Sequence, residues 1–239
     1  MDNAAATVSV RCRDGEVIDD QEWSAVSIDL LKSAVPWRTF RWYKGQRHYS
    51  GTYWSATMRD HVIYESRLEL SRLLLADFAP SVTCIIAQPF LLTVTARGKA
   101  RRHIPDYLLI TDQGPVVVDV KPLRRLSRPE VVFTFDWTRE LVESRGWTYE
   151  VSSEPPVMEL ENIRFLAGYR RDWLVSQELL DEIRNAELDG VATTQAISSL
   201  LPYPEPLVLA AIHHLLWIGY FTVDLGRPLS SSRVLRRAA

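Results

Sequence analysis

Two stretches decide the fold of this chain, Ile104-Pro105-Asp106-Tyr107-Leu108-Leu109 and, after a short gap, Val117-Val118-Asp119-Val120-Lys121. Both are rich in β-branched and other apolar residues, and Asp112-Gln113-Gly114 between them is a good turn sequence. The pattern therefore predicts a hairpin whose strands cover residues 107–111 and 116–120.

The predicted hairpin carries two carboxylates and an amine. Side chains alternate along a strand, so Asp119 and Lys121 share a face, and pairing across the turn would bring Asp106 to the same edge. Two carboxylates at one point repel unless a cation compensates, and oxygen ligands of this kind suit Mg²⁺, for which Mn²⁺ can substitute. Lys121 would orient or deprotonate an attacking water, or stabilise charge developing on phosphorus.

An Asp followed on the next strand by an acid, one spacer and Lys is the nuclease pattern written PD-(D/E)xK. The alternative is an ion-pair ladder on the surface of a hairpin, worth only about 0–1 kcal/mol. Two observations weigh against the ladder. Lys121 is one of only four lysines among 28 basic residues, and Pro122 ends the strand directly after it.

Segment 62–78 has the periodicity of a helix and is expected to complete the site. Glu65 and Glu69 lie four residues apart, on one face, and Glu69 borders the apolar stripe, where it could act as a further metal ligand. Glu65 is more simply an exposed partner of Arg67, Arg72 or a neighbouring loop. Gln88, before Pro89, is either an amide that orients water or phosphate or an ordinary turn residue.

The order of elements around the hairpin predicts an α/β fold with a mixed sheet flanked by helices. A short helix over 28–34, capped by Ser27, precedes it, and a helix over 129–144 with a strand over 147–151 follows it. Residues 1–20 are expected to be a weakly ordered lead-in, apart from a short strand near Val8.

After Glu154-Pro155-Pro156, helices are predicted over 175–185, 193–201 and 204–217, and a small hairpin follows. This order suggests a winged-helix module. Its last helix contains no Arg or Lys, so docking of a protein or packing of the core is favoured over reading of DNA. The basic tail is either a phosphate contact or a solvated end; it contains Arg227, Arg233, Arg236 and Arg237.

The segment 36–58 is dense in aromatic and arginine residues. It could form a nucleic-acid face that uses stacking and guanidinium contacts. The alternative, a flap whose rings pack on the core, is favoured because half-buried Trp and Tyr are common.

Composition excludes several classes of protein. A net charge of −2 gives no overall attraction to nucleic acid, so a basic surface has to be local. Cys12 and Cys84 offer neither a disulfide framework nor a metal cluster. No apolar run approaches the roughly 20 residues of a membrane span, and the polar N-terminus is not a signal peptide. A cytoplasmic protein without membrane contact is expected.

Four motifs in fixed order resemble the TnsA-type transposase endonucleases, over about residues 60–125. They are Tyr64-Glu65-Ser66-Arg67-Leu68-Glu69-Leu70, Gln88-Pro89-Phe90, His103-Ile104-Pro105-Asp106-Tyr107-Leu108 and Val118-Asp119-Val120-Lys121-Pro122. Four ordered motifs are far more specific than a lone D-x-K. Some members carry glutamine where this chain has Asp119, the acid of the wider nuclease pattern.

The resemblance implies a restriction-endonuclease-like domain over residues 36–155, after a lead-in over 1–35 and before a C-terminal helical module over 156–239. It implies a catalytic set of Glu69, Asp106 and Lys121, with Mg²⁺, that cuts the 5′ ends of a transposon in double-stranded DNA. Implied partners are an integrase-type transposase, TnsB, and an AAA+ regulator, TnsC. The implied location is the bacterial cytoplasm, on the nucleoid during transposition.

Two other functions remain open from the sequence. One is a stand-alone restriction or repair nuclease of the same fold. The other is a catalytically silent module that binds DNA or protein.

Overall fold

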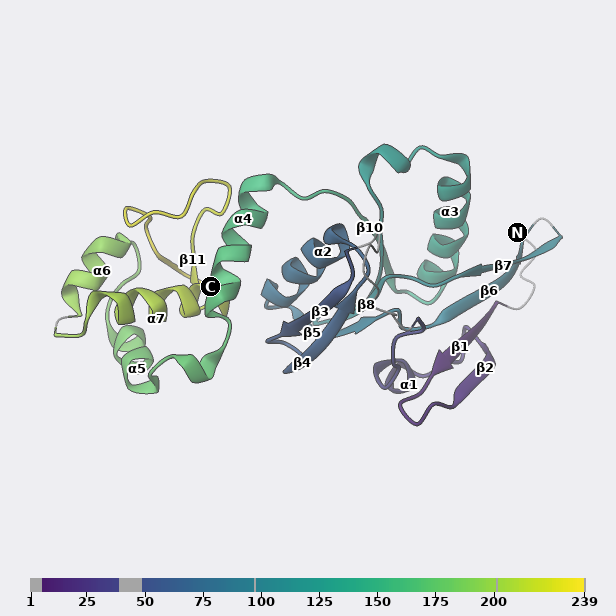
Figure 1. Cartoon of the computed structure of the whole chain (residues 1–239), viewed down its shortest axis with the longest axis horizontal. Coiled ribbons are helices and arrows are strands. Elements are labelled where there is room, and N and C mark those ends of the chain that lie inside the picture. The colour runs from purple at the N-terminus through teal and green to yellow at the C-terminus, as the bar shows by residue number, and fades with distance from the viewer. Residues whose placement is uncertain (1–5, 39–48, 97, 201, 239) are drawn as a thin grey trace. The chain divides into compact units, whose positions relative to one another are not determined.

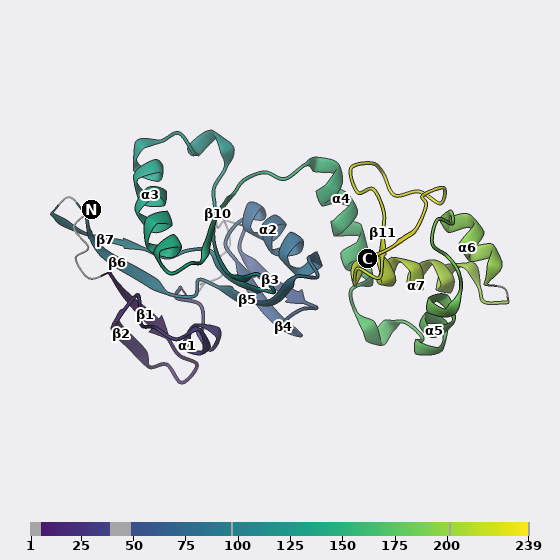
Figure 2. The same cartoon turned by 180° about the vertical axis from the view of Figure 1, so that it is seen from behind.

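The computed structural model describes residues 6–38, 49–96, 98–200 and 202–238 (Figures 1 and 2). The chain forms two compact units. The first contains Met1–Ala76 and Ser81–Glu154, and the second contains Asp77–Pro80 and Pro155–Ala239. The predicted α/β class is confirmed, because the sheets are largely antiparallel and are flanked by helices.

A four-stranded sheet carries the predicted hairpin. Its strand order is β10-β9-β8-β5; β9 and β10 run parallel, and the other pairs are antiparallel, so the sheet is mixed. Tyr107 pairs with Val118, and Gly114 makes the turn with a φ of 111°, which favours glycine. The four strands are β5 (Val82–Ala87), β8 (Tyr107–Thr111), β9 (Gly114–Val120) and β10 (Thr148–Ser152).

The two faces of this sheet are covered by different helices, α2 (Arg67–Phe78) and α3 (Pro129–Ser144). Tyr107 faces α2, where its hydroxyl donates to the Glu69 carbonyl at 3.3 Å. Leu108, on the opposite face, packs in a buried core with Trp137 of α3. Gly146 follows the end of α3 with a φ of 71°, a conformation that favours glycine.

A second four-stranded sheet has the order β2-β1-β6-β7. Its core includes Val8 and Val10, which are fully buried. The short strand expected near Val8 is confirmed as β1, whereas the expectation that the rest of residues 1–20 is weakly ordered is wrong for residues 17–20, which belong to β2. The strands are β1 (Thr7–Arg11), β2 (Val17–Glu22), β6 (Leu91–Ala96) and β7 (Lys99–His103).

The helix expected over 62–78 is shorter at its start. Residues 62–64 belong to a strand, and Ser66 caps the helix through its backbone and side chain. β-branched Val62 and Ile63 suit the strand, and the capping residue sets the boundary. Three short elements complete the unit: β3 (Gly51–Ser55), β4 (Asp60–Tyr64) and α1 (Ile28–Lys32), which Ser27 caps as predicted.

The second unit is mainly helical. Helix α7 is its core, with Val208, Ile212 and Leu215 fully buried. A single bridge joins Ala192 to Val234, and a two-stranded sheet closes the unit. Its elements are α4 (Val157–Leu166), α5 (Gln177–Asn185), α6 (Thr193–Ser199), α7 (Glu205–Trp217), β11 (Phe221–Thr222) and β12 (Arg236–Arg237). Of the 3₁₀ turns, η2 (Ala167–Tyr169) and η3 (Asp172–Leu174) belong to this unit, whereas η1 (Leu123–Arg125) belongs to the first.

Within the part of the chain that the structure describes, no helix is both long enough and apolar enough to span a membrane.

Candidate active site

Asp106 lies directly before β8, between two neighbouring strands. Its amide donates to the Val118 carbonyl at 3.0 Å, and its carbonyl accepts from the Gln88 amide at 2.9 Å. Its carboxylate Oδ2 accepts from the Val120 amide at 2.6 Å. The strand ends thus hold this carboxylate at the edge of the sheet.

The electrostatic environment disfavours the charged form of Asp106. Burial raises the pKa of its carboxyl well above its ordinary value, and the negative charges of Asp119 and Glu69 raise it further. The Val120 amide and the Lys121 ammonium oppose this rise without cancelling it. A cation beside Asp106 would relieve the repulsion.

Asp119 lies deeper, with 2% of its surface exposed. Both of its carboxylate oxygens face His103, whose Nε2 lies 2.8 and 2.9 Å from them. The Tyr149 hydroxyl donates to Oδ2. Burial and the charge of Asp119 raise the pKa of Tyr149, so this hydroxyl keeps its proton and stays a donor.

His103 and Tyr149 are site residues that reasoning from the sequence missed. His103 comes from β7 in one sheet, whereas Asp119 and Tyr149 come from the other sheet, so the contact joins the two. The pairing of Tyr149 with Val117 in register places its ring on the face of Asp119. No local sequence pattern predicts such a contact, because it depends on the packing of two sheets.

Glu69 forms a capping box at the start of α2. Its Oε1 accepts from the Ser66 hydroxyl at 2.8 Å, and the Ser66 Oγ accepts from the Glu69 amide at 3.1 Å. Its Oε2 accepts from the Glu65 amide at 2.6 Å. The S-x-x-E spacing at 66–69 is a readable signal of this cap. Burial raises the pKa of Glu69 despite these hydrogen bonds.

Glu65 donates its amide to this cap, whereas its side chain is an ion-pair partner. Its Oε2 lies 3.0 Å from Arg38 Nη1, in the role that the sequence suggested.

Gln88 is buried and has a φ of 47°, in the left-handed region that non-glycine residues seldom adopt. Its side-chain oxygen accepts from the Arg38 amide at 2.9 Å, and its carbonyl accepts from the Trp37 amide at 3.2 Å. Its side chain therefore anchors the segment at 37–38.

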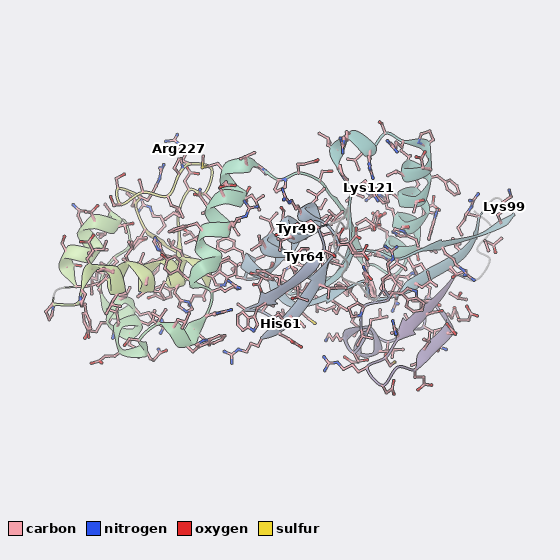
Figure 3. The ribbon with its side chains drawn as sticks, in the orientation of Figure 1. Tyr49, His61, Tyr64, Lys99, Lys121 and Arg227 are labelled. Atoms are coloured by element: carbon pink, nitrogen blue, oxygen red, sulfur yellow. The ribbon has the colours of Figure 1, made fainter. Side chains whose placement is uncertain are left out.

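Lys121 follows β9 at the rim of the sheet, where Figure 3 labels it. Its amide donates to the Ser152 carbonyl at 2.9 Å, which continues the pairing with β10. Its Nζ lies 6.0 Å from the centre of the Phe135 ring on α3. Lys121 and Asp119 thus share the α3 side of the sheet, as alternation along the strand predicts.

The expected site residues are electrostatic neighbours without forming a closed metal cage. Asp106 interacts with Asp119, Glu69 and Lys121. Among the described residues, no group of three or more His, Cys, Asp or Glu side chains is arranged to hold a metal ion. Within the same residues, Oδ1 of Asp106 accepts no hydrogen bond, whereas Glu69 and Asp119 use both oxygens.

The aromatic and arginine segment at 36–58 is described only in part, and residues 39–48, with Phe40, Arg41, Trp42, Tyr43, Arg47 and His48, lie outside the described residues. Tyr53 is buried, in line with packing on the core. Tyr49 is 55% exposed, and the centre of its ring lies 6.2 Å from that of Tyr64 (Figure 3). The Arg67 guanidinium lies over the Tyr49 ring, 4.8 Å from its centre.

No protein-family model and no curated protein matches the sequence. The functional interpretation therefore rests on the residues and on their geometry.

Proposed function

We propose that this chain is a metal-dependent DNA endonuclease that hydrolyses phosphodiesters, and that it serves as the TnsA-like subunit of a heteromeric transposase. One observation carries the proposal. The Asp106 carboxylate is held at a sheet edge, and one of its oxygens accepts no hydrogen bond from the described residues. Burial and neighbouring negative charges raise its pKa, and Lys121, directly after the neighbouring strand, interacts with it. Perturbed carboxylates of this kind are typical of functional sites.

The donor atoms suit Mg²⁺, or Mn²⁺ in its place, because they are carboxylate oxygens. Asp106 would hold the ion, and Glu69 could join it by giving up a capping hydrogen bond. Asp119 fits this role less well, because His103 and Tyr149 occupy its oxygens, and we assign it to positioning Lys121 and the end of β9. When bound, the ion would polarise the phosphodiester and favour the hydroxide form of water.

Lys121 supplies the remaining chemistry from the chain itself. Its ammonium, at the rim beside Asp106, would orient the attacking water and stabilise charge on the phosphorus. Water adds to phosphorus, the bond from phosphorus to the leaving oxygen breaks, and that oxygen takes up a proton.

The arrangement of elements is compatible with this proposal. A mixed sheet between α2 and α3 is compatible with a restriction-endonuclease-like fold. In the second unit, the order of α5, α6, α7 and a terminal pair of short strands is compatible with a winged helix. The buried face of α7 favours packing over reading of DNA.

Cleavage of duplex DNA in Mg²⁺ or Mn²⁺ tests the nuclease proposal. Asp106→Ala and Lys121→Ala are each expected to reduce the rate at least about 100-fold, because each removes transition-state stabilisation of several kcal/mol at about 1.4 kcal/mol per factor of ten. Asp136→Ala, which removes an exposed carboxylate of α3, is the matched control. Cutting that survives both site variants would overturn the proposal.

Asp106→Asn separates chemistry from folding. A carboxyl whose pKa is raised by folding loses stability as the pH rises from its ordinary pKa through the raised value. The amide lacks this penalty, so the variant is expected to be at least as stable as the wild type at pH 7.5. Calorimetry with Mn²⁺ should show weakened binding in the same variant.

The role in transposition is tested with partners. TnsB, TnsC and DNA that carries the transposon ends should redirect cutting to the 5′ ends. Robust and unchanged cutting by the isolated chain would favour a stand-alone nuclease instead.

A catalytically silent binding module is the second candidate. The hydrogen bonds that occupy both oxygens of Glu69 and of Asp119 favour it. Folded protein that binds neither Mg²⁺ nor Mn²⁺ would support this module.

A further inference from the structure

The basic residues of the first unit are distributed unevenly. In the sheet β2-β1-β6-β7, one edge strand has the sequence Val-Ile-Asp-Asp-Gln-Glu and the other has Lys-Ala-Arg-Arg-His. Acidic and basic groups thus occupy opposite edges of one sheet. A chain with a net charge of −2 can therefore attract a polyanion to one side only.

A second group of cations follows the candidate site directly along the chain. Arg124, Arg125 and Arg128 are all exposed, on and just after η1. Backbone hydrogen bonds fix this turn, since the Arg125 amide donates to the Pro122 carbonyl at 2.8 Å and the Arg128 amide to the Arg125 carbonyl at 3.2 Å. The backbone that presents these three side chains is therefore ordered.

Helix α3 connects the two groups. Its Phe133 ring lies 5.3 Å from the Arg101 guanidinium of β7, and its Phe135 ring lies 6.0 Å from Lys121 Nζ. Arg101 Nε is buried and has no hydrogen-bond partner in the part of the chain that the structure describes. Figure 3 labels Lys99 at the tip of the β6–β7 hairpin and Lys121 near the turn that leads into α3.

We name as the basic rim the five residues Lys99, Arg101, Arg124, Arg125 and Arg128. Within the described ranges, none of the five forms an ion pair with a carboxylate. Glu154 accepts from the Leu123 amide and weakly offsets Arg124, and Glu130 and Asp136 are exposed on α3.

The arginines of the second unit differ. Arg164, Arg184 and Arg227 each pair with an acid three residues away, and Arg237 donates to the Arg184 carbonyl and to the Tyr220 hydroxyl. The basic tail is thus largely engaged within its own unit. Within the described residues, the five residues of the basic rim lack such acidic partners.

We propose that the basic rim holds the sugar-phosphate backbone of duplex DNA across the Asp106–Lys121 site, without reading its sequence. This inference rests on the proposed nuclease function. Guanidinium groups form paired hydrogen bonds with phosphate, and most contacts that position a protein on DNA are of this type. Leu123, 68% exposed between Pro122 and Arg124, provides an apolar surface. Deoxyribose can pack against such a surface, whereas a free anion would make no use of it.

Salt-dependent binding tests the rim independently of cleavage. A labelled duplex of random sequence is titrated with the full-length chain in EDTA, and the affinity is measured by fluorescence anisotropy between low and moderate KCl. The test variant is Arg124→Ser/Arg125→Ser/Arg128→Ser. The control is Arg164→Ser/Arg184→Ser/Arg227→Ser, which changes the net charge equally, and circular dichroism checks the folding of both.

The test variant is expected to lose about tenfold to several hundredfold in affinity near 0.1 M salt. The slope of log affinity against log salt should become shallower by about two to three, at roughly 0.9 for each lost phosphate contact. The control variant should retain the affinity and slope of the wild type.

Equal affinity and equal salt slope in the two variants would overturn the proposal that the basic rim binds DNA. The absence of duplex binding by the wild type would overturn it as well. Displacement of the duplex by polyglutamate at equal charge concentration would point to an acidic polypeptide partner and would also overturn it. The binding assay contains EDTA, so its result does not depend on cleavage. Wild-type protein that binds DNA through the rim but does not cut it in Mg²⁺ or Mn²⁺ would contradict only the nuclease proposal.

Discussion

At the level of single residues, Asp119 shows how one carboxylate can stay buried at a sheet edge. Its oxygens accept from the Tyr149 hydroxyl and lie within hydrogen-bond distance of His103. A buried carboxylate without such partners would be strongly unfavourable. The acid of the D-x-K spacing is therefore supported by residues that lie 16 and 30 positions away.

Tyr149→Phe tests this support. The substitution leaves the ring in the core and removes one donor from a buried carboxylate, so unfolding should become easier by about 1–3 kcal/mol. Chemical denaturation measures the change. Tyr203→Phe, which removes an exposed hydroxyl bonded to Glu182, should have little effect, and equal losses in the two variants would count against a special role for Tyr149.

At the level of elements, α2 begins where Ser66 and Glu69 cap each other. The same carboxylate is the one that the resemblance assigns to catalysis. A cap needs an oxygen acceptor, whereas a metal ligand needs a negative charge, so the two roles can be separated by substitution.

Glu69→Gln keeps the acceptor and removes the charge. If Glu69 is a metal ligand, cleavage should fall at least about tenfold while stability changes little. Ser66→Ala should do the reverse and destabilise the first unit by about 1 kcal/mol, with metal binding retained. Metal calorimetry and denaturation, measured on both variants, decide between the roles, and full cleavage by Glu69→Gln would leave Glu69 as a cap alone.

At the level of the whole molecule, the two units are expected to respond differently to acid. His213 is buried on α7, and burial lowers its pKa from 6.5 to about 4. The unfolded chain binds this proton more readily than the folded chain, so the second unit loses stability as the pH falls from 6.5 towards 4. The buried Asp106 of the first unit acts in the opposite direction over the same range.

Thermal unfolding at pH 7 and pH 4.5 measures this difference. Acid should weaken the second unit by up to about 3 kcal/mol through His213, and His213→Leu should remove that part of the pH dependence. His61→Asn, at an exposed histidine, is the control and should leave the pH dependence unchanged. A wild-type pH profile in His213→Leu would contradict the assignment.

The sequence by itself determined the elements whose signals are local. The hairpin of β8 and β9, the presence of a helix within residues 129–144, the cap of α1 and the series of helices after Glu154 all follow from periodicity, turn residues and capping residues. Alternation along β9 also predicted that Asp119 and Lys121 share a face. These features depend on residues a few positions apart, so local patterns in the sequence predict them directly.

Only the tertiary structure decided the features that depend on distant residues. The incorporation of β1 into the core, the contact of His103 with Asp119 and the grouping of Arg101 with Lys121 around α3 each require two elements to pack together. Burial then set the pKa of Asp106, because desolvation and neighbouring charges are properties of the folded molecule. Local sequence places a carboxylate on a strand, and packing decides which partners it has and how far its charge is opposed.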